Sequence, residues 1–95
     1  KRWGRLAYTC LMNTGTVVAL NRSLGLFVVR IDHGPEFAVF ELVSNEVTLN
    51  LGGKVKGALH SMLEEVIVHL DSGERIEVVG QSGPVPEEMA YRLLG

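Results

Sequence analysis

The chain is poor in cysteine and aromatic residues, and it has no long apolar run. Its single cysteine, Cys10, cannot form a disulfide within the chain, and this usage is typical of a reducing compartment. We therefore expect a cytoplasmic protein. No apolar run approaches the roughly 20 residues that a membrane helix requires, so we expect no membrane partner.

Positive charge is also scarce over most of the sequence. Residues 1–11 carry three basic groups and no acidic ones, whereas residues 12–95 carry six basic and eleven acidic groups. Proteins that bind nucleic acid by releasing counterions from phosphates normally present a basic face. The composition therefore argues against strong, non-specific binding, and any basic patch must be local.

Motifs that carry catalytic chemistry are missing as well. The histidines His33, His60 and His69 show no metal-ligand spacing, and Cys10 is far from all of them in sequence. The glycine-rich pieces 52–53 and 80–83 lack the Lys-Ser/Thr pair of a phosphate-binding loop. We expect no enzymatic activity, no metal and no cofactor.

What the chain does contain is a series of short β-type runs. Ninety-five residues make one domain. Apolar, β-branched runs separated by turn residues predict strands at 14–20, 26–31, 37–43, 54–60 and 65–70, with a sixth short strand at 75–79. Pro86 followed by two glutamates predicts the start of a short helix over 87–94.

Strands spaced about ten residues apart, with no long helix between them, predict an all-β fold. We expect a small antiparallel OB-type barrel of five to six strands with a short C-terminal helix. An SH3-like or Sm-like barrel satisfies the same pattern. The predicted organisation is an N-terminal lead-in over 1–11, the barrel over 12–80, and a linker with the helix over 81–95.

One stretch resembles a known family. The motif Gly15-Thr16-Val17, followed by Asn21 and Gly25 at matching intervals, resembles the opening of cold-shock domains. The run 37–42 resembles the second ribonucleoprotein motif of that family, and 51–55 resembles its approach to the fourth strand. The resemblance covers about residues 14–60. It implies an OB-type barrel that binds single-stranded RNA or DNA.

The base-stacking positions of the family are mostly not aromatic here. Where the family has Trp, Lys and three Phe residues, this chain has, in order, Ala19, Leu24, Leu26, Val28 and Ala38. Phe40 stands where the family has a histidine, and it is either a stacking residue or part of a buried apolar contact. Phe27 and Phe37 are expected to point inwards. Because stacking contributes about 1–3 kcal/mol per base, its loss weakens the nucleic-acid prediction.

Two functions follow from these residues. The first is weak binding of single-stranded nucleic acid, with phosphate contacts and limited stacking from Arg22, Arg30, Phe40, Lys54 and Lys56. The second is protein interaction or homodimerisation through an aliphatic face that includes Leu24, Leu26, Val28 and Phe40. A soluble monomer rarely leaves such a face bare. The expected covers are the N-terminal segment with Trp3, Leu6 and Tyr8, the C-terminal helix, or a second copy.

Overall fold

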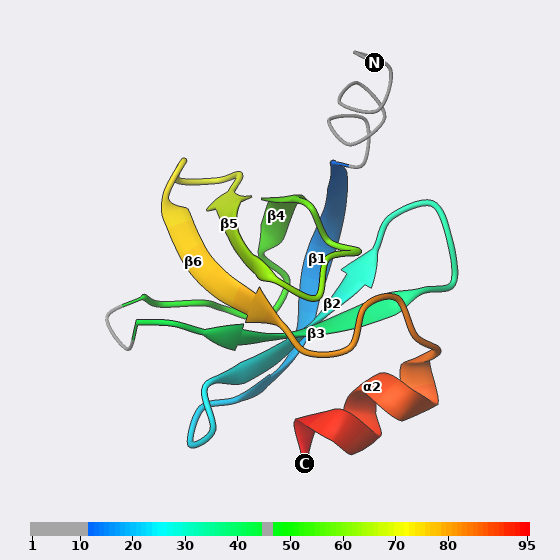
Figure 1. The fold of residues 1–95 in the computed structure, drawn as a ribbon. Helices are drawn as coiled ribbons and strands as arrows, with labels where there is room; N and C mark the ends of the chain where they lie inside the picture. Colours follow the sequence, from blue (N-terminus) through cyan, green and yellow to red (C-terminus); the bar gives the residue numbers. More distant parts are fainter. Residues whose placement is uncertain (1–11, 45–46) are drawn as a thin grey trace.

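The computed structural model describes residues 12–44 and 47–95, which fold as a β-barrel with one helix beside it (Figure 1). The predicted lead-in over 1–11, with the proposed cover from Trp3, Leu6 and Tyr8, lies outside these residues. The elements, in chain order, are β1 (Asn13–Asn21), β2 (Leu26–Ile31), β3 (Phe37–Leu42), β4 (Lys54–Gly57), β5 (Glu64–His69), β6 (Arg75–Gly80) and α2 (Glu87–Leu94).

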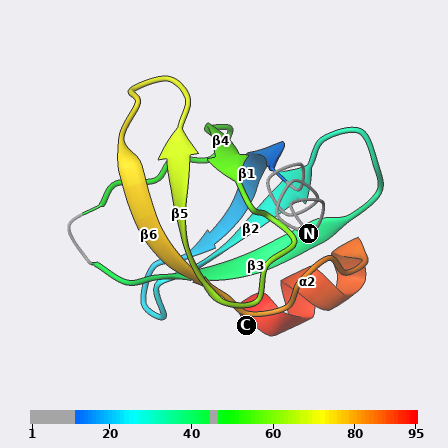
Figure 2. The same ribbon diagram turned by 45° about the horizontal axis from the view of Figure 1, so that its top comes forward.

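The barrel is closed, with the strand order β1-β2-β3-β6-β5-β4 and antiparallel pairing throughout (Figure 2). Strands β1–β3 and β4–β6 each form a meander of three consecutive strands. Pairing of β3 with β6 and of β4 with β1 joins the two meanders, so the six strands leave no free sheet edge. This arrangement confirms the predicted small antiparallel barrel with a C-terminal helix. The fourth strand ends earlier than predicted, at Gly57.

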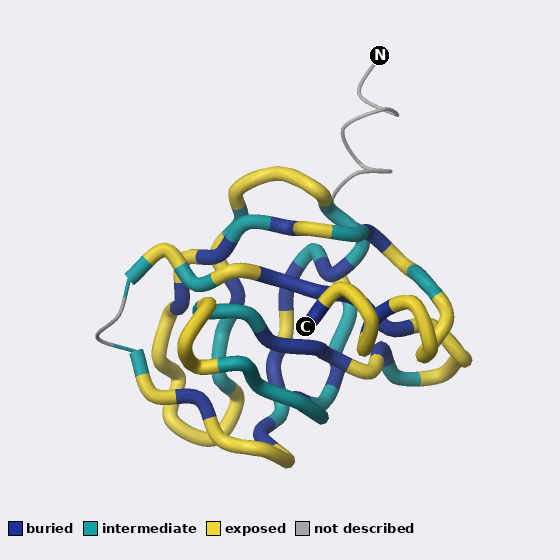
Figure 3. Tube along the Cα trace, turned by 90° about the horizontal axis from the view of Figure 1, so that it is seen from below, coloured by how far each residue is buried: buried dark blue, intermediate teal, exposed yellow. Residues whose placement is uncertain are grey.

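The barrel interior is filled by side chains that alternate with outward residues along each strand. The rings of Phe27 and Phe40 stack at its centre, with their centroids 5.7 Å apart. Around them lies a fully apolar set, contributed by all six strands and by the loop residues Leu49 and Leu59: Val17, Val29, Ile31, Ala38, Leu49, Val55, Leu59, Ile67, Ile76 and Val78. In Figure 3 the buried parts of the chain lie mainly along the strands, and the exposed parts lie mainly in the turns.

Closure of the barrel depends on a glycine where two chain segments meet. A Cβ atom at Gly80 would collide with the backbone carbonyl oxygen of Ser61, and it would lie 2.7 Å from the Cα of Met62. The backbone nitrogen of Gly80 donates to the carbonyl of Leu63. The segment between β4 and β5 can therefore cross close to the end of β6 only because residue 80 has no side chain.

Helix α2 packs against the outer surface of β1, β2 and β3. Its acidic residues Glu87 and Glu88 occupy the first turn, where the helix dipole favours negative charge. At the other end, the Asn21 side-chain amide donates a hydrogen bond of 2.8 Å to the carbonyl of Leu94. That bond ties the last turn of the helix to the end of β1. Within the described part of the chain, no helix is long and apolar enough to cross a membrane.

Candidate functional site

The outer surface of β1, β2 and β3 is where the resemblance places a binding face, and α2 covers it. Ala90 and Leu94 of the helix pack against a second apolar cluster, which contains Val28, Phe37 and Val39. Val18, Ala19, Leu26 and Val85 contribute at its margin. One of the three expected covers, the C-terminal helix, therefore packs on this face.

Of the two alternatives for Phe40, burial is the one that the structure shows, and the burial is inside the barrel and not on this outer face, so its assignment to a binding face is wrong. Its exposed fraction is 0%. The register between β2 and β3 explains why, since Phe40 is paired with Phe27 and Ala38 is paired with Val29. Paired residues point to the same side of a sheet, and Phe27 and Val29 point inwards. Both Phe40 and Ala38 are therefore core residues, and Phe40 offers no ring to a base or a partner.

The other residues of the predicted aliphatic face are also dispersed. Val28 is fully buried beneath α2, and Leu26 is partly buried. Leu24 is exposed at 56%, in the turn between β1 and β2. Phe37 is buried as predicted, but it lies on the outer side of β3 rather than inside the barrel, and its ring is 6.5 Å from that of Tyr91. The residues of the predicted aliphatic face therefore do not form one open surface.

Three of the predicted basic residues do come together, on the outer surface of three neighbouring strands. Thr16 of β1 stands opposite Arg30 of β2 on one side and Lys54 of β4 on the other. Thr14, two residues before Thr16, stands opposite Lys56. Since neighbouring strands are about 4.8 Å apart, the backbones at Arg30 and Lys54 are about 10 Å apart. Arg30 and Lys56 are exposed, and neither has an acidic partner within the described ranges.

Lys54 differs from these two because its charge is already paired. Its Nζ atom donates to Oδ1 and Oδ2 of Asp32, at 3.1 and 2.9 Å, and to the hydroxyl of Thr16 at 3.0 Å. The Thr14 hydroxyl donates to Oδ2 of Asp32 at 2.7 Å. The hydrogen bond from Lys54, and then that from Thr14, hold the pKa of the Asp32 carboxyl below its usual value. Lys54 therefore fixes β4 to the end of β2, and its charge is largely offset.

Sequence reasoning missed a fourth cation that extends this surface. Arg75 of β6 is paired with Val68 of β5, and Val68 is paired with Lys56 of β4. Arg75 is exposed and forms no ion pair with another residue of the described chain. Arg75 could have been identified only from the pairing of β4 with β5 and of β5 with β6, which local sequence patterns do not give. We call Arg30, Lys54, Lys56 and Arg75 the basic strip.

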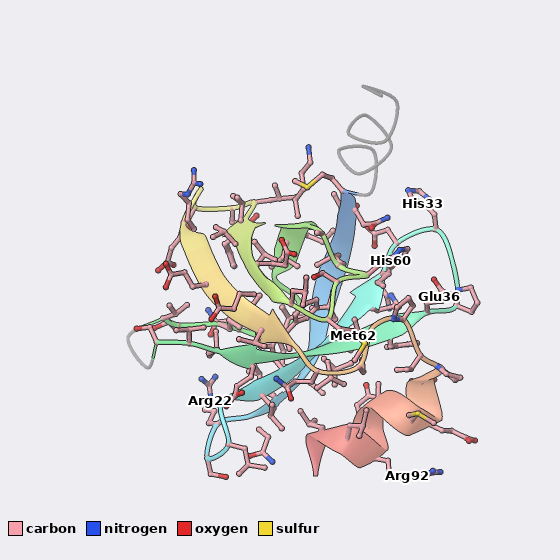
Figure 4. The ribbon with its side chains drawn as sticks, viewed as in Figure 1. Arg22, His33, Glu36, His60, Met62 and Arg92 are labelled. Carbon is pink, nitrogen blue, oxygen red and sulfur yellow. The ribbon has the colours of Figure 1, made fainter. Side chains whose placement is uncertain are left out.

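Arg22 does not join the basic strip. It lies in the turn between β1 and β2, where its Nη2 atom donates to the carbonyl of Leu49 at 3.2 Å. Figure 4 shows Arg22 at the hairpin tip, well away from the loops that carry His33 and His60. Of the five residues predicted to bind nucleic acid, the structure groups Arg30, Lys54 and Lys56. It separates Arg22 and buries Phe40.

Three exposed glutamates lie on the outer surface of the barrel beside the Arg75 end of the basic strip. Glu41 of β3 and Glu64 of β5 both pair with Val79 of β6, while Glu77 of β6 pairs with Val66. All three glutamates are exposed. These three glutamates therefore lie on the outer surface of β3, β6 and β5, and Glu77 is two residues from Arg75 on the same face of β6. The rest of the basic strip lies over β2, β1 and β4.

The histidines show no arrangement that points to chemistry. His60 Nε2 lies 3.6 Å from Glu36 Oε1, and the two side chains come from different loops (Figure 4). Among residues 12–44 and 47–95, no group of three or more His, Cys, Asp or Glu side chains is placed to hold a metal ion.

The comparison with known proteins assigns no relative. No protein-family model matches this chain, and no curated protein and no solved structure matches it.

Proposed function

We propose that this chain is a non-enzymatic, cytoplasmic binding module of the cold-shock-like OB type, which binds the phosphate backbone of single-stranded RNA or DNA weakly through the basic strip. The observation that carries this proposal is the grouping of Arg30, Lys54 and Lys56 on the outer surface of adjacent strands. The charges of Arg30 and Lys56 are free of acidic partners among the described residues.

The residues of the strip suit phosphate contacts rather than base recognition. Arginine and lysine side chains, together with threonine hydroxyls such as those of Thr14 and Thr16, are typical phosphate ligands. The described strands present no aromatic side chain beside them, because Phe27 and Phe40 are inside the barrel and Phe37 is under α2. We therefore expect little sequence preference and low affinity, since stacking contributes much of the binding energy in proteins of this kind.

The salt dependence of such binding has an expected size. Arg30, Lys56 and Arg75 are available to neutralise phosphates, whereas Lys54 is paired with Asp32. For single strands, log K falls with log salt concentration with a slope of about −0.7 per neutralised phosphate. Three contacts give a slope of about −2.

The test is fluorescence anisotropy with labelled single-stranded oligonucleotides of mixed sequence, measured over a series of salt concentrations. Lys56→Gln is compared with Arg92→Gln, which removes the same charge from the exposed side of α2. We expect Lys56→Gln to weaken binding and to flatten the salt slope by about 0.7, while Arg92→Gln leaves both unchanged. Absence of binding by the unmodified protein at low salt would refute the proposal, as would equal effects of the two variants.

Protein interaction through the aliphatic face is less well supported than it was from sequence. Val28 and Val39 are covered by α2, so a partner or a second copy would have to displace the helix to reach them. If the oligonucleotides do not bind, a protein partner at another surface becomes the better hypothesis.

A further inference from the structure

A small hollow lies at one end of the barrel, between the turn that joins β1 to β2 and the loop that follows β3. Its volume is about 270 Å³. Five of its eight described lining residues are aliphatic: Leu20, Leu26, Leu42, Val47 and Leu49. Leu20, Leu42 and Val47 also pack against the barrel core, so contacts with the core support this wall. Barrel mouths with apolar walls and few polar groups are common places for small ligands.

Among the described residues, one charged side chain lines the hollow. The guanidinium of Arg22 is held there by its hydrogen bond to the carbonyl of Leu49, itself part of the wall. That bond uses one of the five N–H donors of the side chain. Arg22 has no carboxylate partner within the described ranges. It can therefore donate to a ligand while it remains anchored to Leu49.

A second polar residue of the wall, Asn21, uses both its side-chain nitrogen and its side-chain oxygen in hydrogen bonds within the protein. Its side-chain nitrogen donates to the carbonyl of Leu94, and its Oδ1 accepts from the hydroxyl of Ser23 and the backbone nitrogen of Leu24. Asn21 thus holds the turn and the helix end in place. Among the described residues that line the hollow, Arg22 is the charged one, and four of its five N–H donors form no hydrogen bond with them.

We propose that this hollow binds a small carboxylate with an aliphatic body. The planar guanidinium of Arg22 matches a carboxylate in two parallel hydrogen bonds, and the leucine and valine side chains accept the hydrocarbon. A volume of about 270 Å³ leaves room for a short-chain carboxylate. A short-chain fatty acid has this size and this division into an anionic head and an apolar chain.

The probe is hexanoate, titrated into isotopically labelled protein and followed by the NMR signals of the methyl groups. We expect saturable shifts at Leu20, Leu42 and Val47, with a Kd on the order of 1 mM, as befits so small a ligand. Hexan-1-ol, which has the same chain and no charge, should bind about tenfold more weakly, because its hydroxyl cannot accept two parallel hydrogen bonds from the guanidinium as a carboxylate does. Arg22→Gln should reduce hexanoate binding by a similar factor, and the matched variant Arg92→Gln should not.

Two results would overturn the proposal. One is the absence of saturable shifts at these methyl groups, and the other is equal binding of hexanoate by the unmodified protein and Arg22→Gln when both retain the folded NMR spectrum. Lys56→Gln separates this site from the basic strip, because it should leave hexanoate binding intact whether or not the protein binds oligonucleotides.

Discussion

The ammonium nitrogen of Lys54 lies 2.9 Å from Oδ2 of Asp32, although 21 residues separate the two along the chain. The side chain of Lys54 reaches past β1, to which β4 is paired, and meets the residue that follows β2. Thr14 and Thr16 of β1 bond to the same pair. This ion pair therefore joins the two meanders at the seam where the barrel closes.

The pair predicts how stability depends on pH. Because its folded-state pKa lies below the usual value of 3.8, the Asp32 carboxylate stabilises the fold above that pH, and the contribution is lost as pH falls through the folded pKa. Asp32→Asn should lower the unfolding free energy by up to about 1 kcal/mol at neutral pH, since the side chain of Lys54 is partly exposed. The measurement is urea unfolding of both proteins between pH 2 and pH 7. A difference that persists unchanged at pH 2 would contradict this assignment.

The same substitution should strengthen binding of single-stranded nucleic acid. Removal of the Asp32 charge takes a repulsive group away from the basic strip and leaves Lys54 with an uncompensated charge. We expect a several-fold tighter Kd at low salt and a steeper salt slope, by about 0.7. Glu36→Gln, which also removes one negative charge, lies in the loop beyond Asp32 and serves as the control. If both variants bind alike, net charge alone accounts for the effect.

The helix cover gives a separate prediction. Ala90 is fully buried against the outer face of β2 and β3, whereas its neighbour Met89 is 42% exposed. Ala90→Glu should lower the unfolding free energy by about 3 kcal/mol, because it places a charge without a partner in an apolar contact. It should also increase binding of a hydrophobic dye and promote self-association that is insensitive to salt. The matched Met89→Glu should change stability by less than about 0.5 kcal/mol. Light scattering that finds both variants monomeric, with dye binding unchanged, would exclude this function of the helix.

The positions of the strands and of the helix were predictable from the residues. Which side of β3 faces the barrel interior was not. Turn residues between apolar runs located β2 at its observed limits, and Pro86 followed by two glutamates located α2. Alternation states which residues of a strand share a side, but not which side faces inwards. For β3 that choice depends on the pairing of Phe40 with Phe27, a contact between strands. The resemblance to cold-shock domains suggested the opposite side, so Phe40 and Ala38 were misplaced.

The candidate site shows the same division between local and long-range information. Alternation along β4 was enough to place Lys54 and Lys56 together. Their meeting with Arg30 requires β1 to pair with both β2 and β4, and the position of Arg75 requires the pairing of β5 with β6. The charge of Lys54 is offset by Asp32, a contact that sequence spacing does not indicate. The docking of α2 over β2 and β3 was one of several possibilities that composition left open.

The last prediction concerns the crossing at Gly80. In Gly80→Ala the new methyl group would meet backbone atoms of Ser61 and Met62, which cannot rotate away as a flexible side chain does. We expect the unfolding free energy to fall by about 3 kcal/mol, at the upper end of the cost of overpacking. The control is Gly34→Ala, in the turn between β2 and β3, where a Cβ meets nothing within 4 Å and the backbone is outside the left-handed region. That variant should be neutral or slightly stabilising, because it restricts the unfolded chain. Thermal and urea unfolding of the two alanine variants measure the difference. Equal stability would mean that the segment between β4 and β5 can move away from β6, and that the barrel does not depend on this close approach.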